Sequence, residues 1–202
     1  MAIVLVLLGG AVWPPVGAVL ALAWARLSRT PWRDLGYVRP KSWVGGLAAG
    51  IAFGAAFKLV MKVVVMPLLG APAVNQAYHH LAGNAAAIPG TLFAMIVGAG
   101  FGEETLFRGY MFERLGKLLG AGARAKVATV ALTAALFGAA HYHDQGLPGA
   151  EQGVVTGLVF GTIFALTGRL WMLMCAHAAF DLTAYGIIYW NLESRVAHLL
   201  SS

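Results

Sequence analysis

The sequence predicts an all-α polytopic membrane protein of about six transmembrane helices, and three observations support this fold class. Hydrophobic residues make up 59% of the 202 residues and charged residues only 11%. The mean hydropathy is +0.75, so there are too few charged side chains to cover a water-facing surface. Apolar runs close to the ~20 residues that cross a bilayer recur along the chain. These runs cover residues 2–25, 43–69, 86–112, 127–141, 152–167 and 169–190.

The first run, 2–25, is expected to form one transmembrane helix that bends at Pro14 and Pro15, because proline kinks a helix. A cleaved signal peptide is the alternative for this run, although no basic residue precedes it. The fourth and fifth runs are shorter than the others. Six helices and short connections use nearly the whole chain, so residues 1–202 are expected to form a single integral-membrane domain.

The second and fifth runs carry glycine at every fourth position. Such a stripe lets another helix approach closely in lipid, so we expect both stripes to be packing faces. The second run also carries Lys58 and Lys62, whose long side chains we expect to extend toward the nearer membrane surface. The stripes are Gly46, Gly50 and Gly54, and Gly153, Gly157 and Gly161.

Basic residues in alternate loops predict the orientation. Cytoplasmic loops are enriched in Lys and Arg, and two loops carry nearly all the basic residues outside the runs. The loops between them contain His, Asn and acidic residues but neither Lys nor Arg. With six spans, this pattern places both termini outside. The basic residues are Arg26, Arg29, Arg33, Arg39 and Lys41 in the first loop, and Arg114, Lys117, Arg124 and Lys126 in the third.

The formal charge of +6 therefore reflects topology and attraction to anionic lipid head groups. A basic patch interleaved with aromatic residues, as nucleic-acid binding requires, is absent from the sequence, so no nucleic-acid partner is expected. The single Cys175 excludes an internal disulfide and is expected to be a small buried filler.

Three charged residues stand together inside the third run. An ionised side chain at the centre of a membrane helix costs about 2.5–3.5 kcal/mol, so Glu103, Glu104 and Arg108 indicate a buried functional site. Glu104 and Arg108 are four residues apart and lie on one helix face, where a purely structural ion pair is the alternative. Glu103 is rotated about 100° away, which makes it the candidate general base.

Two further runs carry polar residues with helical spacing. His141 ends the fourth run, where a histidine also commonly serves as an interfacial or hydrogen-bonded core residue. His177 and Asp181 are four residues apart in the last run, so the carboxyl group can orient the imidazole ring. A structural hydrogen-bonded pair is the alternative for these two.

Together these residues could hydrolyse a peptide bond. Glu103 with His141 could deprotonate a water molecule, while His177 with Asp181 stabilised the developing oxyanion. A metal-dependent version is the alternative, in which Glu104, His141 and His177 bind a divalent ion such as zinc and leave one position open for water. The sequence lacks the His-Glu-x-x-His arrangement of many zinc proteases, so the metal signal is weak.

These residues resemble the motifs of the membrane-embedded CAAX protease and bacteriocin-processing family, the CPBP or Abi group, which includes the prenyl-protein endopeptidase. Its pattern occurs here in order as Glu-Glu-x-x-x-Arg at 103–108, Phe-x-x-x-His at 137–141 and His-x-x-x-Asp at 177–181. The segment Asp34-Leu35-Gly36-Tyr37 resembles a short polar motif of bacterial members. The motif-bearing core covers residues 88–190.

The resemblance implies a CAAX-protease-like helical bundle whose site lies in a cavity between core helices and opens toward the cytoplasm. It implies an intramembrane endopeptidase of a bacterial or archaeal cytoplasmic membrane, acting on a membrane-associated peptide or protein by a glutamate-type or metal-dependent mechanism. Asp181 stands where eukaryotic-type members have Asn, so we expect it to be protonated or paired with His177. The implied roles are Glu103 as base, Glu104 and Arg108 as an orienting pair, His141 as second water-activating group, and His177 with Asp181 as the oxyanion pair.

Two other classes of function remain open at this stage. Intramembrane acids and histidines also form proton relays, so a small ion-coupled transporter is one alternative. A catalytically silent scaffold or immunity factor is the other, because a retained site can bind without cutting. The predicted spans also place Glu103 and His141 at depths that differ by roughly 10 Å, at 1.5 Å per helical residue.

Overall fold

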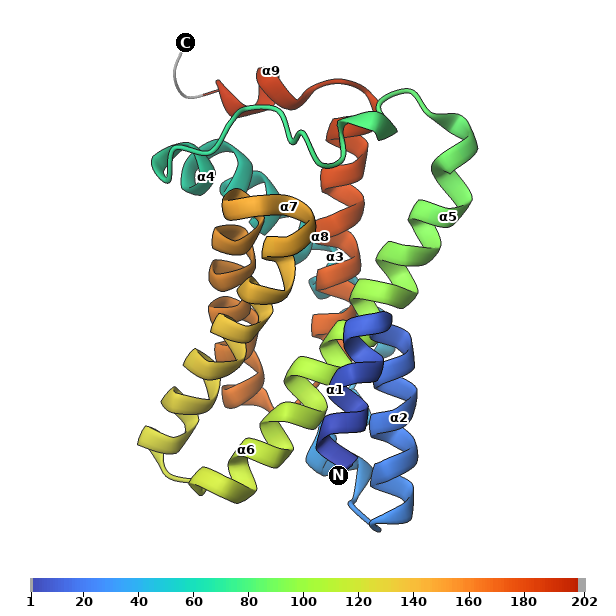
Figure 1. The fold of residues 1–202 in the computed structure, drawn as a ribbon, viewed down its shortest axis with the longest axis vertical. Helices are drawn as coiled ribbons and strands as arrows, with labels where there is room; N and C mark the ends of the chain where they lie inside the picture. The colour runs from blue at the N-terminus through green and yellow to red at the C-terminus, as the bar shows by residue number, and fades with distance from the viewer. Residues whose placement is uncertain (1, 200–202) are drawn as a thin grey trace.

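The computed structural model describes residues 2–199, which form helices and connections without a β-strand (Figure 1). Four helices are long and apolar enough to cross a membrane: Trp43–Leu68, Ala85–Leu119, Ala123–Thr167 and Trp171–Tyr189. The predicted all-α polytopic fold is confirmed. The elements are α1 (Ala2–Val12), α2 (Pro14–Leu27), η1 (Trp32–Leu35), α3 (Trp43–Val60), η2 (Met61–Val65), α4 (Met66–Leu68), η3 (His79–Leu81), η4 (Ala85–Ala87), α5 (Ile88–Phe93), η5 (Ala94–Met111), α6 (Phe112–Leu119), α7 (Ala123–Thr167), α8 (Trp171–Tyr189) and α9 (Glu193–Ala197).

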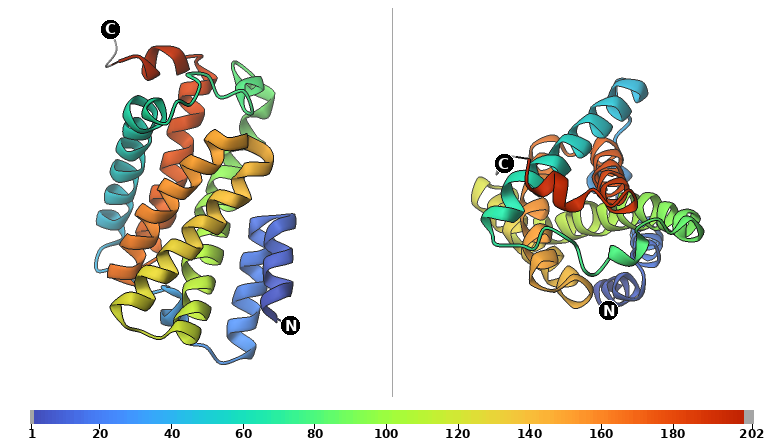
Figure 2. Two further views of the ribbon diagram at one scale, coloured as in Figure 1. Left: turned by 60° about the vertical axis from the view of Figure 1, so that its left-hand side comes forward. Right: turned by 90° about the horizontal axis from the view of Figure 1, so that it is seen from above.

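The first apolar run differs from the prediction of a single bent span. It forms two helices, α1 and α2, that reverse direction and pack against each other at one side of the bundle (Figures 1 and 2). A proline pair fits the first turn of a new helix, where the missing N–H has no partner to lose. With 11 and 14 residues, the helices reach only about 16 and 21 Å, short of a ~30 Å hydrocarbon core.

This hairpin also changes the expected position of the chain ends. Helix α1 begins at the end of the bundle where α2 finishes, whereas α9 lies at the opposite end (Figure 1). The prediction that both termini lie on one side is therefore wrong for the described ends of the chain. The reason is the additional reversal between α1 and α2, which a continuous apolar run conceals.

The fourth and fifth apolar runs are joined in α7, which folds back on itself at Gly146. Gly146 has φ 64° and ψ −161°, a conformation that is essentially restricted to glycine. The two legs then pack closely, because a Cβ on Gly153 would lie 2.9 Å from Gly138 Cα. The predicted stripe of the fifth run is thus a packing face within this hairpin.

The glycine stripe of the second run packs against α8. A Cβ on Gly54 would lie 2.0 Å from the carbonyl oxygen of Ala176, and one on Gly50 would lie 2.7 Å from Cys175 Cβ. The two helices can approach this closely only because glycine has no side chain in the contact. A Cβ on Gly46, by contrast, would meet no other atom within 4 Å, so Gly46 lies outside the contact. The close packing of α3 on α8 fixes the helix that carries His177.

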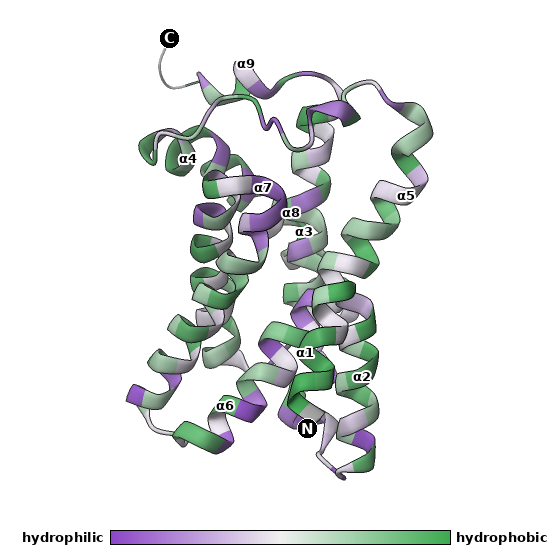
Figure 3. Cartoon of the chain, viewed as in Figure 1, coloured by the Kyte–Doolittle hydropathy of each residue, from purple (hydrophilic) through white to green (hydrophobic). Residues whose placement is uncertain are grey.

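The two ends of the bundle differ in charge. The predicted basic loops, after α2 and after α6, lie at one end, and the connecting segment 69–84, the Gly146 reversal and α9 lie at the other (Figure 1). Hydrophobic residues cover most of the length of the helices, while hydrophilic residues gather near the ends and along the inner parts of α7 and α8 (Figure 3). The bundle therefore has the polarity that a membrane-spanning orientation requires.

Candidate active site

A buried ion-paired group lies where η5 and α8 meet. Glu104 Oε1 accepts hydrogen bonds from Arg108 Nη1 at 2.8 Å and from His177 Nδ1 at 2.7 Å. Glu104 is 0% exposed, Arg108 1% and His177 3%. A carboxylate that holds Nδ1–H fixes both the orientation of the imidazole ring and its tautomer. The ring of His177 is therefore locked, with Nε2 facing away from Glu104.

Two phenyl rings of α7 complete the environment of Arg108. The guanidinium carbon lies 4.6 Å from the Phe137 ring centroid and 5.5 Å from that of Phe160. A guanidinium on an aromatic face is stabilised electrostatically, more so away from water. Phe137 of the Phe-x-x-x-His motif thus helps to hold Arg108 beside Glu104.

Glu103 lies in a different environment from its neighbour. Its side chain is 16% exposed, compared with 0% for Glu104, and it lines a cavity. Glu103 Oε2 lies 3.7 Å from His177 Nε2, and Asp181 Oδ2 lies 3.9 Å from the same nitrogen. These separations exceed a direct hydrogen bond, so His177 Nε2 lies beside two carboxyl groups without a direct hydrogen bond to either.

His141 faces the same cavity from the first leg of α7. Its Nδ1 lies 2.8 Å from the Phe137 carbonyl oxygen, which can only accept, so Nδ1 carries the proton and donates. In the neutral ring Nε2 is then left as an acceptor. Glu103 and His141 both line one cavity, although the predicted depths differed by roughly 10 Å at 1.5 Å per residue. The structure thus brings both residues to one cavity, between helices that are tilted relative to each other (Figure 1).

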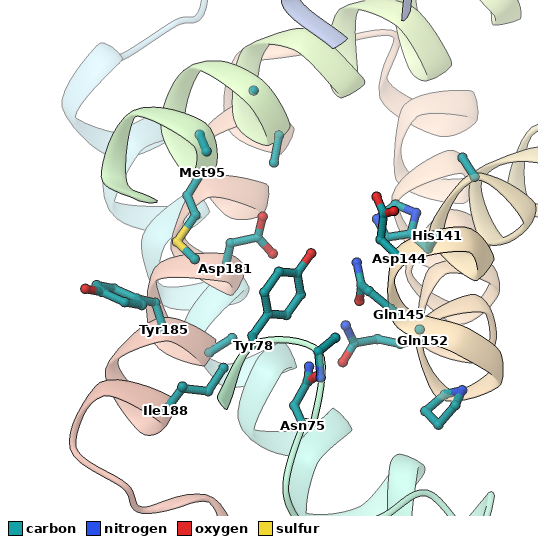
Figure 4. Close-up of a pocket in the computed structure, with 18 of the residues that line it drawn as sticks. Asn75, Tyr78, Met95, His141, Asp144, Gln145, Gln152, Asp181, Tyr185 and Ile188 are labelled. Carbon is teal, nitrogen blue, oxygen red and sulfur yellow. The ribbon is translucent and has the colours of Figure 1, made fainter. Parts of the chain in front are cut away.

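The cavity has a volume of about 1230 Å³ and lies between α7, η5 and α8, under the connecting segment 69–84. Polar side chains from α7, α8 and the connecting segment point into it (Figure 4). It exceeds the usual ~300–1,000 Å³ of ligand pockets, so a peptide segment fits. Its polar lining is Lys58, Lys62, Asn75, Gln76, Tyr78, His80, Thr91, Glu103, His141, Asp144, Gln145, Gln152, Asp181, Tyr185 and Glu193.

Tyr78 of the connecting segment was missed by the sequence analysis. Its ring enters the cavity with the hydroxyl directed toward the region between Asp181, Asp144 and His141 (Figure 4). Burial raises the pKa of the Tyr78 hydroxyl, and the charges of Asp181, Asp144 and Glu103 raise it further. The hydroxyl is therefore a neutral hydrogen-bond donor. A tyrosine in a loop has no helical spacing, so only its place between two apolar runs could have marked it.

The connecting segment is fastened by Glu193 at the start of α9. Glu193 is 2% exposed and accepts the backbone N–H of Asn75 at 2.7 Å. His79 Nδ1 lies 3.1 Å from its other oxygen, and Lys62 Nζ lies 3.8 Å away. These interactions join the connecting segment to α9 and so form the roof of the cavity.

The Asp34-Leu35-Gly36-Tyr37 motif supports η5 from outside the site. The Tyr37 hydroxyl lies 2.6 Å from Thr105 Oγ1, and burial raises the pKa of Tyr37. Gly36 has φ 84°, and a Cβ there would lie 2.4 Å from the Phe164 ring. The motif is therefore a clamp on the helix that carries the two acids.

The metal set suggested by the sequence does not fit this geometry. Glu104 Oε1 is occupied by Arg108 and His177, and Glu104 does not line the cavity that His141 faces. Glu104 Oε2 has no hydrogen-bond partner, but it is buried away from the cavity. No group of three His, Cys, Asp or Glu within residues 2–199 has positions that could hold a metal ion. Glu104, His141 and His177 therefore do not converge as ligands.

Residues 85–183 match the family model described as Type II CAAX prenyl endopeptidase Rce1-like. This segment contains all three motifs and the helices that build the site. The chain belongs to the Rce1-like family. Searches among curated proteins and solved structures returned no match. Membership in the Rce1-like family makes the chain a member of a protease family and, with four long apolar helices, an integral membrane protein.

Proposed function

We propose that this Rce1-like protein is an intramembrane endopeptidase that hydrolyses peptide bonds of membrane-associated proteins or peptides, as a CAAX-type prenyl-protein endopeptidase does. The observation that carries the proposal is that Glu103, His141 and Asp181 line one cavity, while the buried His177 Nε2 lies 3.7 Å from Glu103 and 3.9 Å from Asp181. Two proton acceptors and a fixed imidazole are the groups that attack of water on a carbonyl requires.

In the proposed first step, Glu103 removes a proton from a water molecule while His141 Nε2 accepts a hydrogen bond from it. The water oxygen then bonds to the peptide carbonyl carbon, and the carbonyl π electrons move onto oxygen. Glu103 passes its proton to the departing amine as the C–N bond breaks. One carboxyl group thus serves first as base and then as acid, so Glu103 ends the reaction in its starting protonation state.

Stabilisation of the oxyanion is assigned to His177. Its ring is held through Nδ1 by Glu104, which is itself held by Arg108, so Nε2–H can point at a developing charge without reorganisation. Asp181 is proposed to be protonated or to share a proton with His177, since an ionised carboxylate would repel the oxyanion. The Tyr78 hydroxyl is proposed as a second donor at the same place.

The direct test is cleavage of a panel of fluorescent membrane-associated peptides by the purified protein in lipid. Wild type is compared with Glu103→Ala and His141→Ala, each with and without a strong chelator. We expect cleavage by wild type in both conditions and none by either variant. Loss with chelator and rescue by zinc would contradict the metal-free assignment. No cleavage across a broad panel would contradict the proteolytic function and favour a scaffold or a transporter.

The side of the membrane on which the cavity opens is a second part of the proposal. The cavity extends to the end of the bundle that carries the connecting segment and Gly146, opposite the basic loops. The charge rule predicts that the basic loops are cytoplasmic, whereas the family resemblance implies that the cavity opens toward the cytoplasm. Because the basic loops and the opening lie at opposite ends of the bundle, these two expectations disagree. We propose the charge-based orientation. Cysteines introduced near Arg33 should then react with reagents only from the cytoplasmic side, and cysteines near Gly146 only from the outer side.

A further inference from the structure

The Lys58 side chain does not extend toward the membrane surface, contrary to the expectation from the sequence. It lies on α3 with 8% exposure and contributes to the wall of the cavity. Its Nζ donates a hydrogen bond to Gln152 Oε1 at 2.8 Å and lies 4.7 Å from the Phe180 ring centroid. The long side chain is therefore directed inward, where an ammonium group is far more costly than at an interface.

The surroundings of Lys58 leave its charge without a paired carboxylate. Among the residues that the structure describes, it forms no ion pair, whereas Arg108 is paired with Glu104 at 2.8 Å and Lys62 with Glu193 at 3.8 Å. An amide oxygen and an aromatic face stabilise an ammonium only partly, and a buried charge is normally retained where it has a partner. Lys58 is thus positioned to pair with an anionic group that enters the cavity.

The position of Lys58 connects it to the hydrolytic groups. Phe180, under its ammonium group, precedes Asp181 in α8, and Asp181 lies 3.9 Å from His177 Nε2. The other charged residues of the wall, apart from the paired Lys62, are acidic: Glu103, Asp144, Asp181 and Glu193. A carboxylate entering this cavity therefore has one favourable place.

We propose that Lys58 and Gln152 form a subsite for a carboxylate group of the substrate, close to the bond that is cut. This inference rests on the proposed endopeptidase function and specifies its substrates. The Lys58 ammonium pairs with one carboxylate oxygen, and the Gln152 side-chain N–H₂ can donate to the other. The carboxylate comes either from the free C-terminus of the substrate or from an acidic side chain near the cleavage site.

Binding of short membrane-associated fluorescent peptides to the protein in nanodiscs tests the subsite without requiring cleavage. Three probes share one apolar sequence: a free C-terminal acid, its C-terminal amide, and an amide with a glutamate near its end. We expect at least one carboxylate-bearing probe to bind about 10–100-fold more tightly than the plain amide, the range of a charge-assisted hydrogen bond. The acid and the glutamate probes distinguish the two sources.

The variants isolate Lys58. Lys58→Met, similar in length and apolar, should bind carboxylate and amide probes about equally, and Lys58→Arg should restore part of the preference. Lys117→Met is the control, a lysine of α6 outside the cavity lining whose charge is paired with Glu113, and it should keep the preference.

Equal binding of all probes by wild type, absence of binding, or an unchanged preference in Lys58→Met would overturn the proposal. A preference that disappears in Lys117→Met but persists in Lys58→Met would also overturn it. Cleavage of the same probes is measured in parallel. A carboxylate preference that depends on Lys58, without any cleavage, would sustain the subsite while overturning the protease assignment, and the reverse pattern would do the opposite.

Discussion

Glu103 and Glu104 are adjacent in the chain, but they belong to two different regions of the molecule. Glu104 is sealed among Arg108, His177 and the rings of α7, with both strong partners within 2.8 Å. Glu103 lines a cavity, and its Oε2 lies 3.7 Å from His177 Nε2. One region holds the helices and a ring in place, and the other is the region to which we assign the proposed chemistry. The difference teaches that a helix can place two identical side chains in different environments by turning them about 100° apart.

The largest effect is expected from Glu103→Gln, which removes the proposed base while keeping its shape. Cleavage should fall by about 10²–10⁴-fold, because proton transfer by a placed group contributes that much. Rates of peptide cleavage in lipid measure this loss. Glu151→Gln, an acid of α7 outside the cavity lining, is the control and should cleave normally. Full activity of Glu103→Gln would remove the distinction between the two regions.

Glu104→Ala should affect the fold itself. It leaves the buried Arg108 without its carboxylate, and breaking one partner of a buried ion pair costs about 3–5 kcal/mol. The free energy of unfolding in detergent micelles should therefore fall by about that amount, whereas Glu103→Gln should leave it nearly unchanged. A Glu104→Ala protein as stable as wild type would show that the sealed region has no structural role.

Tyr78→Phe sharpens the description of the reactive region. Loss of one oxyanion donor lowers kcat by about 10²-fold or more, with little change in KM. Steady-state kinetics separate the two constants. Tyr142→Phe, an exposed tyrosine of α7, serves as the control. A rise in KM with unchanged kcat would assign Tyr78 to substrate binding instead.

The smallest effect is expected from Asp181→Asn. If Asp181 is protonated, Asn keeps a neutral group of the same shape, and activity should stay within about threefold of wild type, less than 1 kcal/mol. The same peptide assay measures it. Complete loss of activity would mean that the carboxyl proton or charge is needed, and Asp181 would then join the reactive groups beside Glu103.

The sequence was informative where charge is rare. In an apolar chain, Glu103, Glu104 and Arg108 stand out, and the helical spacing of four correctly placed Arg108 beside Glu104. The spacing of His177 and Asp181 placed them on one face, but the strong partner of His177 is Glu104 of another helix, at 2.7 Å. Contacts between distant segments are set by packing, which spacing within one helix does not encode.

Two other features required the folded chain. The run 2–25 has the length and hydropathy of one span, and only backbone reversal at Trp13 separates α1 from α2. Lys58 carries the same charge whether it extends to lipid head groups or into a cavity, and the choice depends on Gln152 and Phe180, which are distant in sequence. Composition predicts that a chain lies in a membrane, but it does not predict the direction in which each side chain points.

Glu104 and Arg108 of η5 are joined to His177 of α8, and Arg108 also contacts the rings of Phe137 and Phe160 in α7. The group therefore links three helical units of the bundle. Membrane helices insert first and associate afterwards. Until η5, α7 and α8 have come together, nothing holds the imidazole of His177 in its reacting orientation. The proposed hydrolysis is thereby tied to completed assembly, and we expect copies caught midway through biogenesis to stay inert toward neighbouring proteins in the same membrane.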